Sequence, residues 1–259
     1  MKKTKKTSAQ EKRRRIVEQR RNRQLKAVIA ILLVAISAEA LYIASGSKYF
    51  NIKKIDISGN SRLSTEKILK LSGISLKDNI FRVNAGLVAK RVKGEPWIKS
   101  ATVSRALPLT IKIAVSERQP RAIWLSGPTY YLLDTDGAVV SVGPAPPLAG
   151  LPLIKDAPPD NGLETGETVK APAVKNALAV IAALDKDILA DIGWVSAPTI
   201  DGLAIHLNSG PVVMYGKAEM SKQKNYAIKV IRTEATNEGK VWQYIDVRVP
   251  SNPVAKAAA

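Results

Sequence analysis

The most informative absence is cysteine, which does not occur in the 259 residues. The chain therefore has no disulfide, no thiol nucleophile and no cysteine ligand for a metal. Histidine is nearly absent too, since His206 is the only one. It alternates with Ile205 and Leu207 as in a strand, so it is expected to face away from them, toward solvent. A single histidine seldom holds a metal ion, and we expect no metal and no other cofactor.

Several enzyme signatures are missing as well, including G-x-S-x-G, the P-loop and H-E-x-x-H. Two stretches, Ser64–Lys67 and Ser221–Lys224, fit the S-x-x-K pattern of penicillin-binding enzymes, but neither S-D-N nor K-T-G accompanies them. Both serines stand at the start of predicted helices, where a serine side chain caps backbone N–H groups. We therefore expect no enzymatic activity and no small-molecule substrate.

Acidic residues are scarce in the first tenth of the chain. Residues 1–26 contain twelve Lys or Arg against Glu11 and Glu18, so they carry more than half of the net charge of +18. Such a cluster can bind nucleic acid or anionic lipid. It has no aromatic residue to stack on bases and it directly precedes an apolar run. These features favour a disordered cytoplasmic tail that sets membrane topology, with no nucleic-acid partner.

The apolar run at residues 27–47 allows two interpretations. Ala38-Glu39-Ala40 fits the small-x-small pattern of a signal-peptide cleavage site, and cleavage would release a secreted protein. However, the preceding hydrophilic segment is long for a signal peptide, and the apolar run continues beyond Ala40. Its length corresponds to about 31 Å of helix, which matches a bilayer core. We therefore predict an uncleaved transmembrane helix with a cytoplasmic N-terminus.

Glu39 is the one charged residue of this predicted transmembrane helix. A carboxylate inside the hydrocarbon costs roughly 2–3 kcal/mol. Near the outer end of the helix, its side chain can reach the interface or remain protonated. Glu39 is therefore either tolerated at the membrane boundary or in contact with a partner's membrane helix, and we favour the first interpretation.

The next segment, residues 50–118, predicts the order β-α-α-β-β. An alternating strand ends at Gly59-Asn60, and a helix begins at Ser64 or Thr65 and ends at Gly73. A second stretch with helical periodicity follows, and then two strands, which are separated at Leu107-Pro108. This order predicts a small α+β layer with helices on one face of a sheet.

Residues 119–250 predict a mixed β-domain with two helices. Asp136-Gly137 between strand-like runs indicates a tight turn, because the remaining ligands of a calcium loop are missing. Residues 144–166, rich in Pro and Gly, indicate a long exposed connection. The two helices are expected from Pro172 and over residues 218–235. Beyond the domain, residues 251–259 are expected to form a C-terminal tail.

Particular phrases in these two segments resemble the FtsQ/DivIB family of bacterial cell-division proteins. In the first segment they are Pro96-Trp97, Leu107-Pro108 and the phrase from Val115 to Ala122 (VSERQPRA). In the second they are Ile245-Asp246-Val247-Arg248 and the strand from Gly210 to Gly216, where Tyr215 replaces the usual leucine. The resemblance covers residues 27 to about 250. Within it, Glu117-Arg118 is either an ion pair at the junction of the domains or two solvated residues.

The resemblance implies an α+β protein with a single transmembrane helix, a POTRA domain and an FtsQ-type β-domain. It also implies a non-catalytic scaffold in the cytoplasmic (inner) membrane at the division septum, with the C-terminus outside the cytoplasm. The implied partners are FtsB/DivIC-type and FtsL-type bitopic proteins, which link it to septal peptidoglycan synthesis. A POTRA-bearing export or membrane-assembly factor is the alternative, although such proteins usually repeat the POTRA unit or end in a membrane barrel.

The last strand of the predicted β-domain, near residues 242–254, offers a mechanism for partner binding. A strand at a chain end often forms an unpaired sheet edge, to which an extended partner segment can add a strand. The competing interpretation is ordinary packing of the same side chains. The candidate partner-binding residues are Tyr244, Val247, Val249, Ser251 and Val254.

Overall fold

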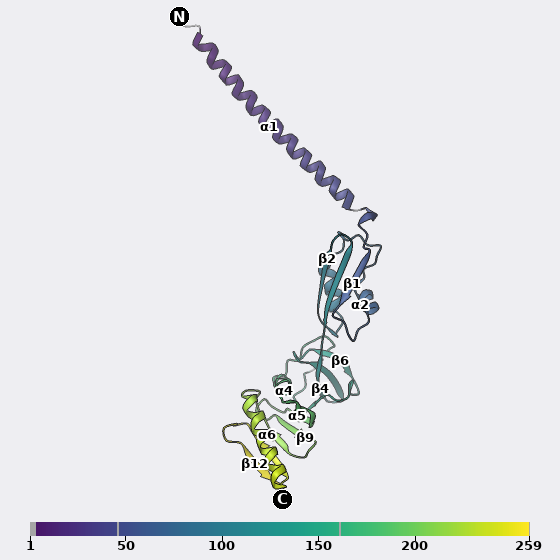
Figure 1. The fold of residues 1–259 in the computed structure, drawn as a ribbon, viewed down its shortest axis with the longest axis vertical. Coiled ribbons are helices and arrows are strands. Elements are labelled where there is room, and N and C mark those ends of the chain that lie inside the picture. The colour runs from purple at the N-terminus through teal and green to yellow at the C-terminus, as the bar shows by residue number, and fades with distance from the viewer. Residues whose placement is uncertain (1–3, 46, 161, 259) are drawn as a thin grey trace. The chain divides into compact units, whose positions relative to one another are not determined.

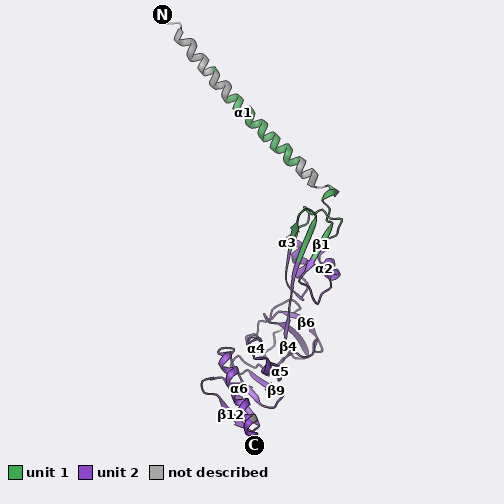
Figure 2. Ribbon diagram, in the orientation of Figure 1, with its two compact units in different colours: residues 1–56, 74–85, 103–113 green, residues 57–73, 86–102, 114–259 purple. Residues whose placement is uncertain are grey.

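The computed structural model describes residues 4–45, 47–160 and 162–258, without the side chains of residues 4–13, 15–19, 40–45 and 236. The chain divides into two compact units (Figure 2): residues 1–56, 74–85 and 103–113 form one, and residues 57–73, 86–102 and 114–259 form the other. The elements of the first half are α1 (Thr4–Ser45), η1 (Lys48–Phe50), β1 (Lys54–Ser58), α2 (Thr65–Ser72), α3 (Ala85–Lys93), β2 (Ile98–Ala106), β3 (Thr110–Glu117), β4 (Pro120–Ser126) and β5 (Thr129–Asp134). Those of the second half are β6 (Val139–Gly143), β7 (Leu153–Lys155), α4 (Pro172–Ala183), α5 (Lys186–Ala190), β8 (Ile192–Ser196), β9 (Ala204–Leu207), β10 (Val212–Met214), α6 (Ser221–Glu238), β11 (Trp242–Asp246) and β12 (Val254–Ala257).

Helix α1 is continuous over 42 residues and includes most of the basic segment (Figure 1). The prediction of a disordered tail is therefore wrong for residues 4–26. The physical reason is composition: between residues 4 and 45 the chain has no Gly or Pro, and Lys, Arg, Gln, Glu and Ala all favour helix. Glu39 lies exposed on this helix.

Across the residues that the structure describes, no helix combines the length and the apolarity needed to cross a membrane. The predicted transmembrane helix at 27–47 includes residues 40–46, whose side chains lie outside the described residues. The transmembrane helix therefore stays a prediction.

The segment after α1 has the predicted order β-α-α-β-β, with strands β1, β3 and β2 adjacent in that order. Helix α2 begins and ends as its sequence predicts. The Lys67 backbone N–H donates to Ser64 Oγ at 3.2 Å, and Gly73 ends the helix with a φ of 65°. That positive φ favours glycine because a Cβ would be strained there.

The remaining strands form a nine-stranded sheet in the order β12-β11-β10-β9-β8-β7-β4-β5-β6. Strand β7 lies in the middle of this sheet and pairs in parallel with both β4 and β8. It falls within residues 144–166, which we predicted to be an exposed connection, and Ile154 is fully buried. That prediction is thus wrong at Leu153–Lys155, because long-range pairing orders a strand too short to show a sequence pattern.

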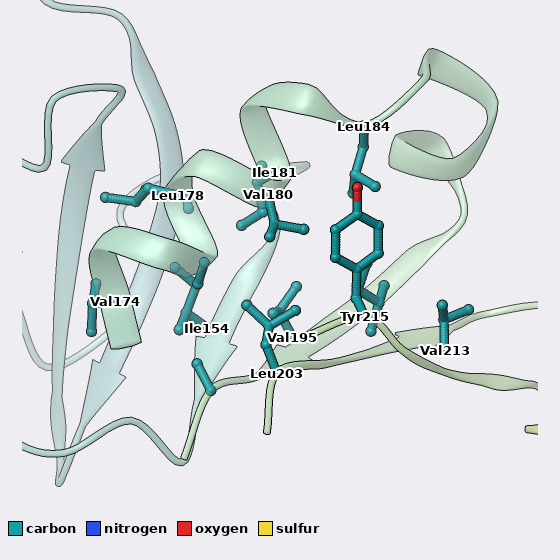
Figure 3. Close-up of a cluster of buried hydrophobic side chains, with 14 of the residues drawn as sticks. Ile154, Val174, Leu178, Val180, Ile181, Leu184, Val195, Leu203, Val213 and Tyr215 are labelled. Carbon is teal, nitrogen blue, oxygen red and sulfur yellow. The ribbon is translucent and has the colours of Figure 1, made fainter. Parts of the chain in front are cut away.

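Helices α4 and α6 lie against one face of the nine-stranded sheet. Figure 3 shows Val180 and Ile181 of α4 on the side of the helix toward Ile154 and Val195 from the strands, in one buried cluster. Alternation places successive strand residues on opposite faces. Tyr244, Val212, His206 and Trp194 therefore stand in register on the face without helices. The two edges of the sheet are β6 and β12.

Candidate partner-binding edge

Strand β12 presents one side of its backbone to the open edge of the sheet. On the inner side it pairs antiparallel with β11, and the Ala258 N–H donates to the Val241 carbonyl at 2.8 Å. Backbone groups alternate in direction along a strand, so Val254 and Lys256 also face β11. The N–H and C=O groups of Ala255 and Ala257 therefore face outward, where another strand can pair with them.

An apolar groove of about 1270 Å³ runs beside this edge on the helix side of the sheet. Strand residue Ala255 lines it, and Trp242 closes it from β11, with the indole Nε1 donating to the Ile231 carbonyl at 3.1 Å. From helix α6 come Tyr226 and Val230, and Tyr226 is 70% exposed. The groove therefore offers contact area to apolar side chains of an added strand.

A charged hollow of about 580 Å³ lies beside Val254, where Asp246, Arg248 and Lys224 contribute to its lining. The Arg248 Nη2 is 2.6 Å from Asp246 Oδ2, and Arg248 Nε lies 3.1 Å from both carboxylate oxygens. The hydrogen bond from Arg248 lowers the pKa of Asp246 despite partial burial. The Asp246 carboxylate therefore stays ionised to a lower pH than an isolated one, and it pairs with Arg248 where the chain leaves β11.

Lys224 in the same hollow is 3% exposed, and its ammonium donates to the carbonyls of Tyr215 at 3.0 Å and Lys217 at 2.8 Å. Burial lowers its pKa. These two carbonyl contacts compensate part of the cost of burying a charge. We therefore assign Lys224 a structural role in joining α6 to the chain after β10.

The structure places the predicted partner-binding residues differently from one another. Tyr244 is half-buried on β11 and stands opposite Lys256 of β12. Val249, Ser251 and Val254 are exposed on and before β12, with exposed fractions of 60% for Val249 and 49% for Val254. Val247 is fully buried and belongs to the hydrophobic core. Val247 therefore packs in the core next to the edge and is not available to a partner. The other four residues remain candidates for direct contact with a partner.

Sequence reasoning missed the strand that forms the edge itself. Residues 251–259 were expected to be a tail, whereas Val254–Ala257 form β12. The segment VAKA carries little strand propensity, and its pairing depends on β11. The apolar groove was missed as well, because it forms only when α6 and β12 lie beside β11. Pro250 and Pro253 were the available sequence signal, since proline is typical of edge strands.

The two S-x-x-K segments carry structural serines and lysines. Ser64 caps α2 as predicted, and the Lys67 ammonium lies 3.0 Å from Glu95. Ser221 is not a side-chain cap: Met220 occupies that position, and the Ser221 hydroxyl donates to the Ala218 carbonyl. Both lysine ammoniums and the Ser221 hydroxyl thus have partners outside the motif, and the Ser64 hydroxyl oxygen accepts the Lys67 backbone N–H, which does not support a Ser-Lys nucleophile.

His206 faces away from Ile205 and Leu207, as predicted, but it is half-buried. Its ring stacks on Trp194 at a centroid distance of 3.6 Å and an interplanar angle of 8°. Burial lowers the pKa of His206, and the nearby Lys155 acts in the same direction. Among the described residues no group of His, Asp and Glu side chains is arranged to hold a metal ion.

Comparisons with known proteins agree with this architecture. The family model for the FtsQ-type POTRA domain matches residues 50–118, and the model for the C-terminal part of the cell-division protein FtsQ/DivIB matches residues 122–248. Two similar proteins are both named cell division protein FtsQ. That of Corynebacterium glutamicum is 27% identical over 85% of this chain and 95% of its own length. That of Syntrophotalea carbinolica is 30% identical over 88% of this chain and 81% of its own length.

Proposed function

Because the chain belongs to the FtsQ/DivIB family of bacterial cell-division proteins, we propose that it is a non-catalytic scaffold of the division septum. Its proposed partners are FtsB/DivIC-type and FtsL-type bitopic proteins, through which it connects to septal peptidoglycan synthesis. The absence of cysteine from the sequence and the structural partners of the S-x-x-K residues support a binding function over catalysis.

The proposed location is the cytoplasmic membrane, with the basic segment inside and the two folded domains outside. The basic residues before residue 27 support this orientation by the positive-inside rule. The continuous helix α1 over the apolar run supports an uncleaved anchor, because a helix satisfies its own backbone hydrogen bonds in lipid. In this arrangement Glu39 lies near the outer end of the membrane helix.

The open edge of β12 is the observation that carries the proposal. Outward-facing backbone groups at Ala255 and Ala257 are able to pair with an extended partner segment. Side chains of that segment on the helix side would enter the apolar groove, and those on the other side would meet Val254 and the Asp246–Arg248 pair. Backbone pairing supplies affinity in this mode, and the two hollows supply selectivity.

The cellular test is depletion of the protein followed by rescue with variants of its full-length chain. Depletion is expected to give filamentous cells, and a fluorescent full-length fusion is expected at mid-cell. Normal division with an export defect would instead favour the POTRA-bearing export factor. A shortened, diffuse product would indicate cleavage after Ala40 and exclude the anchor.

The molecular test uses a proline at the edge. Ala257→Pro removes one outward N–H, whereas Ala257→Val keeps the N–H and adds comparable bulk. We expect the proline variant to bind its partners poorly, to be weakly localised at mid-cell and to fail to restore division. The valine variant should restore division. Equal rescue by both would show that strand addition at β12 is not the binding mode.

A further inference from the structure

The carboxylate of Asp134 stabilises the turn between β5 and β6 through two hydrogen bonds. Asp134 Oδ1 accepts the backbone N–H of Asp136 at 2.9 Å and that of Ala138 at 2.8 Å. Asp134 is also 1% exposed, so its second oxygen needs a partner inside the protein. The turn thus positions two carboxylates, those of Asp134 and Asp136, for contacts beyond itself.

Two cations from the POTRA segment meet these carboxylates. Arg118, which follows β3, places Nη1 2.6 Å from Asp134 Oδ2 with both side chains largely buried. Lys99 on β2 places Nζ 2.6 Å from Asp136 Oδ2, at half-exposed side chains. The sequence left Glu117-Arg118 as either a junction ion pair or two solvated residues, and both interpretations are wrong, because Arg118 pairs with Asp134 and Glu117 accepts hydrogen bonds from residues 61–63. We call the Arg118–Asp134 and Lys99–Asp136 contacts the junction pairs.

Glu117 holds the POTRA side of the junction by a different set of contacts. Its carboxylate accepts the hydroxyl of Ser61 and the backbone N–H groups of Arg62 and Leu63, each at 2.9 Å. Burial acts to raise the pKa of Glu117, but these hydrogen bonds outweigh it and the pKa is lowered. The ordered Arg62 then places its guanidinium 3.9 Å from the ring centre of Trp97.

Trp97 provides the apolar part of the junction. Its carbonyl accepts the backbone N–H of Arg118 at 2.8 Å. Its ring packs against a small cluster of the C-terminal domain, formed by Ile123, Leu132 and Val140, which are 3% exposed or less. This cluster lies on the sheet face without helices, so a residue of the POTRA segment completes its burial.

We infer that the junction pairs, together with Trp97, fix residues 57–73 and 86–102 of the POTRA segment and the C-terminal domain as one body. Relative motion is the usual expectation for two domains joined by a short connection. Here a largely buried Arg118–Asp134 pair opposes it, because separating the domains would leave a desolvated charge without its partner. This inference concerns the junction alone and does not depend on partner binding at β12.

The absence of cysteine makes a direct test available, since two introduced cysteines are the only labelling sites. Spin labels at the exposed positions Lys70→Cys and Lys186→Cys report one distance distribution by pulsed electron resonance, with the full-length chain in lipid nanodiscs. We expect a narrow distribution in the otherwise unchanged chain. In the variant Lys99→Gln/Arg118→Gln the distance distribution should be roughly twofold broader or more, because only the packing of Trp97 then opposes relative motion.

Two controls keep the test decisive. Lys240→Gln removes an exposed ion pair of the same 2.6 Å separation, Lys240–Glu238, and should leave the distribution narrow. The double exchange Lys99→Asp with Asp136→Lys reverses the charges of one junction pair. Its distance distribution should be narrower than that of Lys99→Asp alone. A broad distribution in the unchanged chain, or an equally narrow one in Lys99→Gln/Arg118→Gln, would overturn the inference.

Discussion

The centre and the edge of the nine-stranded sheet show how one sheet serves two purposes. At the centre, Ile154, Val195 and Ile205 are fully buried beneath helices. At the edge, β12 carries alanines, one lysine and a half-exposed valine, and half of its backbone groups face outward. Side-chain burial therefore fixes the centre, whereas available backbone groups distinguish the edge. Substitutions at the centre should change stability, and those at the edge should change recognition.

An open edge also carries a risk, because any extended chain can pair with it. The sequence around β12 contains three of the usual protections. The strand is short, Lys256 places a charge on it, and Pro250 and Pro253 precede it. These features limit pairing between copies of the chain and leave room for a partner whose side chains fit the adjacent hollows.

The largest effect is expected from Ile154→Ala at the centre of the sheet. The substitution leaves a cavity among α4, β4 and β8, and we expect the free energy of unfolding to fall by about 2–5 kcal/mol. Urea denaturation of the full-length chain in detergent measures it. Val254→Ala at the edge is the matched control and should change stability by less than about 0.5 kcal/mol. Similar losses in both variants would remove the distinction between centre and edge.

A sharper form of the comparison uses two valines that are separated by a single residue. Val247 is fully buried and Val249 is 60% exposed. Val247→Ala is expected to cost about 1.5–3 kcal/mol of stability, because two buried methyl groups are lost and a cavity remains. Val249→Ala should leave stability unchanged and weaken partner binding instead. Denaturation curves and pull-down of the proposed FtsB/DivIC-type partner measure the two effects, and a stability loss in Val249→Ala would contradict this division of roles.

The same contrast explains what the sequence alone could predict. The elements of the POTRA segment could be predicted because local signals mark where they begin and end. Ser64 caps α2, Gly73 ends it, and Leu107-Pro108 separates two strands. Strand β7 was not readable, because three residues carry no periodic pattern and their pairing with β4 and β8 is long-range. Local chemistry thus appears in the sequence, and tertiary pairing does not.

The candidate site followed the same rule. Its position near the end of the chain was predictable, and so were the exposed residues Val249, Ser251 and Val254. Which backbone groups face outward was not, because that depends on the register of β12 against β11. Val247 was a candidate as well, because it falls within the predicted last strand near residues 242–254, although it lies in the core. The edge strand within the predicted tail and the groove beside it were identified only from the structure.

The smallest effect is expected from Asp246→Asn, at the end of the strand that supports the edge. Arg248 lowers the pKa of Asp246 below its ordinary value of 3.8, so the pair stabilises the fold above about pH 4. That contribution is lost as the pH falls through the lowered pKa, because the carboxyl group then becomes neutral. We expect Asp246→Asn to reduce stability by about 0.5–1 kcal/mol at pH 7, and the difference from the unchanged chain to shrink as the pH falls below 3.8. Urea midpoints across this range measure it, with Asp201→Asn, which breaks the exposed 3.5 Å pair to Lys217, as the control. A difference that stays constant with pH would mean that Asp246 supports the edge by packing and not by charge.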